Sequence, residues 1–544
     1  MDIYQGEELK SFVQSTLNSE FKERFILKDL HNYMTSSNDR KACCLYGLRR
    51  TGKTVMALQE MKKLNDYNNT LFISCNENDA MWGLHSIIND KIKQNPNLKY
   101  LFIDEATKIS DFIGSCSFLA DAYAMRGIKV VLSGTDSLGF YITLGDELLD
   151  RAHLLHTTYI PFKEYNYLLD KGIEDYIAYG GTLTDGTENV YYNNDVAAFY
   201  TNSAIADNIF NSLHNWGTRG NYALDILYRM DNRGDLTSFI NKIIEYHNRT
   251  FLADVINKDF KSHDLGSLLQ IMAQRADPNE LGNPALLKSD ELNDNIRIAL
   301  GIKHSHFHTA DETAVKLIIQ YLKALDVLYE IPQSAWLKEV GKEKYIFTQV
   351  GMRYCQATSF AEMLVNYKAF GEFTLPQREK ILETLDNDIK GGILEDIIFY
   401  QLSVENKDDK NIEILKYHNA QSQEIDAVIY DRSSKSICLI EIKHSNEQVE
   451  GQRKHLCNEP LCTEIVSKAG VPIANKVVIY LGENGQSDDG VLYINAEDFL
   501  KQSKEISREL LKSPNIAEFK QLESLINASE HKKTPKKFDM VDDD

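Results

Sequence analysis

The fold of this chain is decided by the stretch Gly47-Leu48-Arg49-Arg50-Thr51-Gly52-Lys53-Thr54, which fits the pattern G-x-x-x-x-G-K-[ST] without a mismatch. The apolar run Ala42–Tyr46 precedes it, and the helix-like stretch Val55–Lys63 follows it. Strand, loop and helix in this order are the context of a phosphate-binding loop. Its backbone N–H groups and the helix N-terminus cradle phosphates, and its glycines allow a close approach.

This loop predicts a site for ATP or GTP, with Mg²⁺ as the accompanying ion. Lys53 is expected to reach the β- and γ-phosphates, and the Thr54 hydroxyl is expected to hold Mg²⁺. Arg49 and Arg50 lie where the phosphate charge would be, so they either contact the nucleotide or cover the helix. The residues expected to bind the nucleotide in this loop are Gly47, Arg50, Thr51, Gly52, Lys53 and Thr54.

A second motif narrows the prediction to ATP hydrolysis. The apolar run Tyr100–Asp104 ends in the acidic pair Asp104-Glu105. Asp104 is expected to complete the Mg²⁺ shell, and Glu105 to polarise the attacking water. An acidic pair at a strand end is often only a polar turn. The catalytic interpretation is favoured because the pair comes about fifty residues after the loop, with one strand between.

Three further residues are candidates to face the γ-phosphate. The strand-like run Lys129–Ser133 ends in hydroxyls, so Ser133 or Thr135 is expected to sense the phosphate, although hydroxyls after a strand are also ordinary turn residues. Arg151 precedes a fifth strand, His153–Thr157, and is a candidate for the same role; a surface arginine is the alternative.

Bulk composition indicates a soluble, cytoplasmic, multidomain chain. The 544 residues are 43% hydrophobic and 26% charged, without an apolar run long enough to cross a bilayer. The eight cysteines are expected to be free thiols in a reducing compartment. The net charge of −20 argues against a surface coated for non-specific nucleic-acid binding, and it leaves a local basic groove open.

The order of the patterns predicts an α/β fold in several parts. A parallel sheet of the P-loop type comes first, because strand-like and helix-like runs alternate. The expected parts are a P-loop ATPase core at 1–170, a helical lid at 171–300, a winged helix at 301–385, an α/β PD-(D/E)XK nuclease-like domain at 386–510, and a C-terminal helix with a disordered tail at 511–544.

The nuclease-like prediction comes from a second set of charged residues. Asp426 interrupts an apolar run, and the next strand ends in Glu441-Ile442-Lys443. Strand alternation places Glu441 and Lys443 on one face. Asp426 and Glu441 are then expected to hold a divalent cation, while Lys443 orients water or stabilises charge on a scissile phosphate. Glu395, in the helix-like run Ile393–Leu402, would complete the acidic set.

The alternative is that these side chains form an ordinary solvated face, since E-x-K is common on strands. The order of helix Glu, strand Asp and strand E-x-K is more specific than any one piece. The fold is therefore favoured, and retained cleavage is left open.

Taken together, these motifs resemble the bacterial and archaeal AAA-type ATPases that carry a winged helix and a C-terminal nuclease-like domain of unknown function. Additional matching stretches are Pro161-Phe162-Lys163-Glu164-Tyr165, Tyr179-Gly180-Gly181 and Tyr345-Ile346-Phe347. The resemblance implies ATP binding at Gly52, Lys53 and Thr54, and Walker B roles for Asp104 and Glu105.

The leading hypothesis is an ATP-hydrolysing protein whose nucleotide state controls Mg²⁺-dependent cleavage of DNA. One rival is an ATP-dependent regulatory switch, in which the C-terminal fold binds a protein partner and cleaves nothing. A second rival is an oligomeric motor acting on DNA, which needs an arginine from a neighbouring subunit; Arg151 is the candidate.

Overall fold

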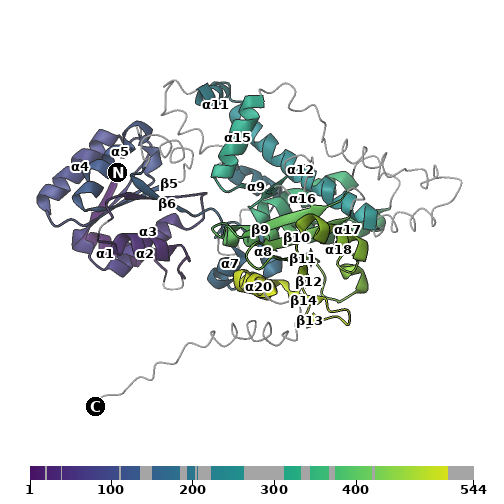
Figure 1. Ribbon diagram of the computed structural model, residues 1–544. Coiled ribbons are helices and arrows are strands. Elements are labelled where there is room, and N and C mark those ends of the chain that lie inside the picture. The colour runs from purple at the N-terminus through teal and green to yellow at the C-terminus, as the bar shows by residue number, and fades with distance from the viewer. Residues whose placement is uncertain are drawn as a thin grey trace, which may run out of the picture. The chain divides into compact units, whose positions relative to one another are not determined.

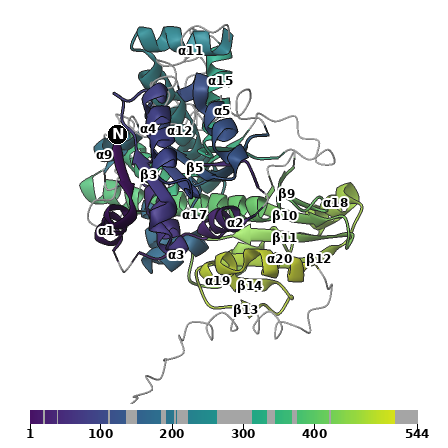
Figure 2. The same ribbon diagram turned by 90° about the vertical axis from the view of Figure 1, so that its left-hand side faces the viewer.

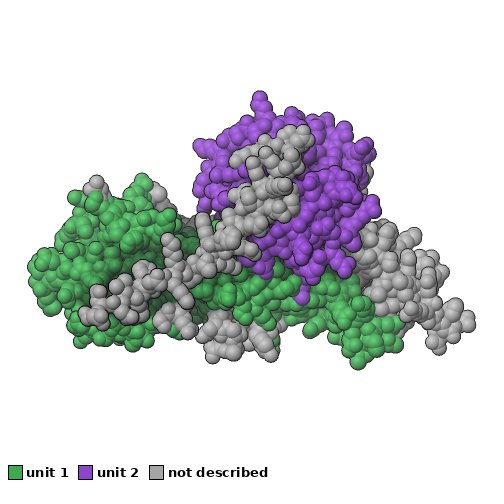
Figure 3. All heavy atoms as spheres, turned by 90° about the horizontal axis from the view of Figure 1, so that it is seen from below, with its two compact units in different colours: residues 1–329, 347–389 green, residues 330–346, 390–544 purple. Residues whose placement is uncertain are grey.

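A computed structural model of the chain describes residues 1–18, 21–37, 39–109, 112–134, 150–183, 191, 193–201, 205, 222–262, 312–332, 344–366, 374–419 and 423–511. The chain divides into two compact units, coloured separately in Figure 3. The first contains residues 1–329 and 347–389, and the second contains residues 330–346 and 390–544.

The first unit is built on a six-stranded sheet with the order β1-β3-β4-β5-β2-β6. All neighbouring strands are parallel except the edge strand β1, which runs antiparallel to β3. The strands are β1 (Asp2–Gln5), β2 (Ala42–Tyr46), β3 (Thr70–Ser74), β4 (Tyr100–Asp104), β5 (Lys129–Gly134) and β6 (Ala152–His156). The predicted α/β fold with a parallel P-loop sheet is confirmed.

Helices cover both faces of this sheet, as Figure 1 shows. On one face, α4 (Met81–Gln94) and α5 (Phe112–Ala122) pack against side chains such as Cys44 and Ile103. On the other, α1 (Gly6–Thr16), α2 (Leu27–Thr35) and α3 (Lys53–Leu64) pack against Cys43 and Phe102. Successive strand residues point to opposite faces, so continuous apolar runs fill both layers.

The helical part of the first unit follows β6. Its helices are α7 (Phe162–Leu169), α8 (Ile173–Tyr179), α9 (Asn194–Thr201), α11 (Tyr222–Asn232), α12 (Leu236–Ser262), α15 (Glu312–Ala324) and α16 (Val350–Val365). The strands β7 (Leu328–Glu330) and β8 (Tyr345–Phe347) pair between α15 and α16. A helix, a strand pair and a helix are the elements expected of the winged helix, which stays a prediction.

The second unit also contains a six-stranded sheet, with the order β13-β14-β12-β11-β10-β9. Strands β9, β10 and β11 are antiparallel neighbours, whereas β11, β12 and β14 are parallel; Figure 2 shows β9 to β12 side by side. The strands are β9 (Ile412–His418), β10 (Glu424–Asp431), β11 (Ser436–Ile442), β12 (Ile473–Tyr480), β13 (Gly485–Gln486) and β14 (Leu492–Asn495).

The helices of this unit are α18 (Glu459–Ala469), α19 (Ala496–Lys501), α20 (Ser503–Leu510) and the C-terminal part of α17 (Leu375–Asn406). On one face of the sheet, Leu461 and Ile465 of α18 join the core formed by residues such as Leu439 and Val478. The helix predicted at Ile393–Leu402 is therefore a segment of the much longer α17. Over the described ranges, no helix is long and apolar enough to cross a membrane.

Candidate functional site

The phosphate loop connects β2 to α3, and its backbone depends on residues that adopt positive φ angles. Gly47 has φ 148° and Gly52 has φ 87°, a region that favours glycine over residues with a Cβ. A Cβ on Gly47 would lie 2.4 Å from Thr157 Oγ1 and 2.9 Å from the Thr158 backbone nitrogen. The positive φ angles thus favour glycine at both positions, and at Gly47 the close packing against the segment after β6 also excludes a Cβ.

Lys53 is the first residue of α3, and its side chain points back into the loop. It is only 7% exposed, and its Nζ donates to the carbonyls of Gly47 and Leu48, both at 2.8 Å. Burial lowers the pKa of Lys53 to about 8, although the carboxylates of Glu105 and Asp104 oppose this shift. The ammonium group therefore lies inside the loop, with two acidic residues close to it.

Asp104 lies between two hydroxyl groups, one from helix α3 and one from strand β5. Thr54 Oγ1 donates to Asp104 Oδ2 at 3.0 Å, and Ser133 Oγ donates to Asp104 Oδ1. Burial raises the pKa of Asp104 above its usual value, while the bond from Ser133 opposes the shift. Hydroxyl and carboxylate oxygens are hard ligands of the kind that Mg²⁺ binds, so Thr54 and Asp104 fit a magnesium ion chelated by phosphates.

The sheet order explains why these three side chains meet. Strand β5 lies between β4 and β2, and Ser133 on β5 pairs with Leu45 of β2. The pair Ile103 and Leu132 places Ser133 beside Asp104. The second hydroxyl predicted to sense phosphate, Thr135, lies outside the described residues.

Glu105 follows β4 in a left-handed conformation, with φ 54°. This turn directs the chain away from the strand, into the short 3₁₀ helix Ala106–Lys108. The Glu105 carboxylate acts against the burial that lowers the pKa of Lys53, and its Oε2 lies 3.7 Å from Lys108 Nζ. That location suits a base that orients water beside the γ-phosphate.

The two arginines of the loop are fixed through their backbone carbonyls. The Leu183 N–H donates to the Arg50 carbonyl at 2.8 Å, and the Tyr200 hydroxyl donates to the Arg49 carbonyl at 2.8 Å. Arg50 has φ 63° and is exposed. Leu183 and Tyr200, which follow β6 in the helical part of the unit, thus contact the loop through the backbone of Arg49 and Arg50, the two arginines predicted either to contact the nucleotide or to cover the helix.

The prediction that Arg151 faces the γ-phosphate is wrong for the loop of its own chain. Strand β6 runs parallel to β2, and Arg151 precedes it; the Arg151 carbonyl accepts from the N–H of Ala42, at the start of β2. The phosphate loop leaves the other end of β2. The Arg151 guanidinium instead lies 3.3 Å from Asp121 Oδ1, with 46% of the side chain exposed.

In the second unit, three of the four predicted residues of the nuclease-like set converge. The strand pair Ala427 and Ile440 places Asp426 opposite Glu441, and both side chains are 4% exposed. Lys443 Nζ lies 2.7 Å from Glu441 Oε2 and 3.3 Å from Asp426 Oδ2. Burial acts to lower the pKa of Lys443, but the surrounding carboxylates raise it above its usual range.

Two further residues interact electrostatically with this acidic cluster of Asp426, Glu441 and Lys443. Glu395 of α17 is one of the carboxylates that raise the pKa of Lys443. His455 Nδ1 lies 3.6 Å from Glu441 Oε1, and this carboxylate raises the pKa of His455. Sequence reasoning missed His455, because it lies in a turn after β11 where no motif marks it.

Asp426 and Glu441 are the two residues of this cluster that would hold a divalent cation. Glu441 Oε1 is buried and has no hydrogen-bond partner, so one acidic oxygen has capacity for a further ligand. Among the described residues, no three His, Cys, Asp or Glu side chains are grouped to hold a metal. Two carboxylates still suffice for Mg²⁺, which takes its other ligands from water and substrate phosphates.

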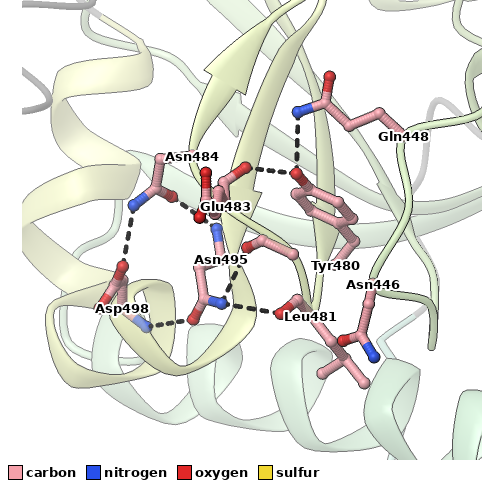
Figure 4. Close-up of a pocket in the computed structure, with 9 residues that line it drawn as sticks. Asn446, Gln448, Tyr480, Leu481, Glu483, Asn484, Asn495 and Asp498 are labelled. Carbon is pink, nitrogen blue, oxygen red and sulfur yellow. Dashed lines mark hydrogen bonds between the residues drawn. The ribbon is translucent and has the colours of Figure 1, made fainter.

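A polar pocket of about 690 Å³ also lies in the second unit, near the ends of β12 and β14. Figure 4 shows that its side chains bond mainly to one another: Asn484 Nδ2 donates to Asp498, and Asn495 Nδ2 donates to the carbonyls of Leu481 and Gly482. Asn495 also accepts from two N–H groups at the start of α19. These bonds shape the turns around the pocket.

Two segments of the chain match known families. Residues 39–166 match the family described as "AAA domain" (AAA_14). This segment is similar to P-loop domains of the AAA type. Residues 390–499 match the family described as "Domain of unknown function (DUF4143)". No curated protein matches the chain.

Two solved structures align with parts of this chain. One is PCH-2 of C. elegans, with 14% identity, a TM-score of 0.25, and coverage of 42% of this chain and 67% of that one. The other is the Hsp104-ADP complex of S. cerevisiae, with 12% identity and a TM-score of 0.24. That alignment covers 70% of this chain and 50% of the Hsp104 chain.

Proposed function

We propose that this chain binds Mg·ATP at the phosphate loop and hydrolyses it. The observation that carries the proposal is the pair of hydrogen bonds that bring Thr54 and Ser133 onto Asp104, beside the buried ammonium of Lys53. The match of residues 39–166 to the AAA domain family supports ATP binding and hydrolysis.

Each residue then has a separate task. The N–H groups around Gly52 and the Lys53 ammonium hold the phosphates, while Thr54 and Asp104 hold Mg²⁺. The ion, when bound, neutralises charge on the β- and γ-phosphates. Glu105 orients the attacking water and accepts its proton, and Ser133 fixes the carboxylate of Asp104.

The test is ATP turnover by wild type and by Lys53→Ala. Loss of the ammonium removes a charge from the phosphates, so turnover should fall to background. Lys62→Ala is the matched control, because Lys62 lies on the same helix and is exposed. Equal turnover in wild type and Lys53→Ala would overturn the proposal.

The second candidate function is Mg²⁺-dependent cleavage of DNA by a PD-(D/E)XK-like domain in the second unit. It is favoured by the position of Lys443 between Asp426 and Glu441, and by the buried Glu441 Oε1, which has no hydrogen-bond partner. In this proposal, Asp426 and Glu441 hold the cation, with Glu395 nearby, and Lys443 stabilises charge on the scissile phosphate. A winged helix built from α15, β7, β8 and α16 would contact the DNA.

This candidate is tested by incubating plasmid and single-stranded DNA with Mg²⁺ or Mn²⁺, with and without ATP. Asp426→Ala should abolish cleavage, whereas Glu413→Ala should not, because Glu413 lies on the neighbouring strand in a surface pair with Arg432. A dependence on ATP would show that the two sites are coupled. Absence of cleavage on all substrates would favour the regulatory switch, with a protein partner for the second unit.

A further inference from the structure

Arg24 is a buried arginine behind the phosphate loop, and its guanidinium uses all five of its N–H groups. Its side chain is 4% exposed. Nε and Nη2 donate to the two oxygens of Glu164, each at 2.9 Å, in a bidentate pair. The other donors reach the carbonyls of Thr51 at 2.7 Å, Thr157 at 3.0 Å and Tyr159 at 3.1 Å. An arginine has five N–H donors, so this set is complete.

These bonds join three segments that are far apart in the sequence. Thr51 belongs to the phosphate loop, Thr157 and Tyr159 follow β6, and Glu164 lies in the first turn of α7. Glu164 Oε1 also accepts from the N–H of Phe25 at 2.7 Å, which holds the arginine's own segment in place. A charged, bidentate pair in a buried setting has a defined geometry that a flexible lysine does not reproduce.

The bond to Thr51 determines the orientation of one peptide group in the loop. The peptide between Thr51 and Gly52 is planar and trans, so its C=O and N–H point in opposite directions. With the Thr51 carbonyl directed at Arg24, the Gly52 N–H is directed away from Arg24. The stem of Arg24 packs behind Gly52, with its Cδ 3.7 Å from the position of a Cβ there.

We infer that Arg24, held by Glu164, is a positioning residue that keeps the Thr51–Gly52 peptide in its phosphate-binding orientation. This inference rests on the proposed nucleotide site. Without Arg24 the peptide is free to rotate, and a rotated peptide presents a carbonyl oxygen to the phosphates in place of an N–H donor. The affinity for ligands that carry phosphates is therefore expected to fall.

The test is calorimetric titration of the full chain with Mg·ADP and Mg·ATP. Arg24→Lys keeps the positive charge but loses the bidentate geometry of the guanidinium. We expect the affinity of this variant for both nucleotides to fall about 10- to 100-fold, the range for losing a charged hydrogen bond. The double variant Arg24→Met with Glu164→Met removes both buried charges at once, so it avoids an isolated buried carboxylate. Its nucleotide affinity should fall at least as far, even where its melting temperature stays near that of wild type.

Two controls separate positioning from general stability. Lys129 is a buried cation at the start of β5, bonded to the carbonyl of Asp39, and Lys129→Met should lower stability without a comparable loss of affinity. Millimolar guanidinium should restore part of the affinity of Arg24→Ala, because the ion can fill the same donor positions, and it should leave Lys129→Met unchanged.

Unchanged affinity in Arg24→Lys and in the double variant, with wild type binding nucleotide, would overturn the role of Arg24 alone. A wild type that binds neither nucleotide would overturn the proposed ATP site, and the inference about Arg24 with it.

Discussion

Thr54 Oγ1 lies 3.0 Å from Asp104 Oδ2, which joins the end of the phosphate loop to the end of β4. Because Asp104 is held in this position by Thr54, the neighbouring Glu105 is the carboxylate that we expect to act as the general base for the attacking water. We expect Glu105→Gln to lower ATP turnover by about 100-fold or more, the typical contribution of a general base. Mg·ATP affinity should stay close to wild type, since the amide keeps the shape of the side chain.

Asp104→Asn is the informative comparison for this first prediction, because it removes the charge that holds Mg²⁺. In that variant the affinity for Mg·ATP should fall, and added Mg²⁺ should recover part of it. If Glu105→Gln instead weakened binding and left the turnover number unchanged, the assignment of the two carboxylates would have to be exchanged.

The second prediction concerns pH and the loop lysine. Burial lowers the pKa of Lys53 to about 8, with Arg49 and Arg24 acting in the same direction and Glu105 and Asp104 against it. Bound phosphates favour the charged ammonium, so they raise this pKa, and the protonated form is the one that binds. Affinity for Mg·ADP should therefore be constant between about pH 7.5 and 8 and fall above pH 8, by up to about tenfold per pH unit.

Nucleotide phosphates are fully ionised above about pH 7.5, so they do not contribute to this decline. Lys53→Arg provides the control, because its guanidinium stays charged over the whole range. Its affinity is expected to be weaker but flat between pH 7.5 and about 9.5. A wild-type profile as flat as that of Lys53→Arg would show that Lys53 keeps an ordinary pKa.

The third prediction compares two glycine substitutions in the same domain. Gly47→Ala forces a Cβ to within 2.4 Å of Thr157 Oγ1 at φ 148°, so it should destabilise the unit by about 1–3 kcal/mol or more and abolish nucleotide binding. Gly83 lies in α4 with nothing within 4 Å of its would-be Cβ. Gly83→Ala should stabilise by about 0.5–1 kcal/mol. Urea titration measures both, and equal effects would contradict the strain argument.

Sequence reasoning predicts the strands of the first sheet well, because buried parallel strands are continuous apolar runs between helices. The run Tyr100–Asp104 is a strand with those bounds. The edge strand β1 is not predicted, since it is short and belongs to a polar N-terminus. The same reasoning indicates that Asp426 and Glu441 meet, because alternation along neighbouring strands sets which side chains share a face.

Other features depend on contacts that no local pattern records. Arg24 and Glu164 are 140 residues apart, and neither lies in a motif with a known partner position. The γ-phosphate role predicted for Arg151 places this residue at the wrong end of the sheet, because a residue that precedes a parallel strand lies at the opposite end from the loop that follows the neighbouring strand. His455 approaches Glu441 through a turn whose path only the folded chain defines.

The last prediction concerns the acidic cluster of the second unit. Lys443→Met leaves the carboxylates of Asp426 and Glu441, each 4% exposed, without their shared cation. Breaking a buried pair in this way costs about 3–5 kcal/mol, and the lower end applies because Lys443 is 32% exposed. In the proposed cation site, a divalent ion would bind the folded cluster and not the unfolded chain, so Mn²⁺ or Mg²⁺ should raise the melting temperature of this variant more than that of wild type.

Lys468→Met is the matched control for the cluster. Lys468 pairs with Glu464 on an exposed helix face, where the two side chains are 42% and 35% exposed. Such pairs contribute about 1 kcal/mol or less, and the variant should show no additional response to Mn²⁺. Thermal melts of the three proteins across a Mn²⁺ series measure the difference. Equal melting temperatures for the two variants, or a missing Mn²⁺ response in Lys443→Met, would mean that Asp426 and Glu441 do not form a cation site, and cleavage by this cluster would lose its physical basis.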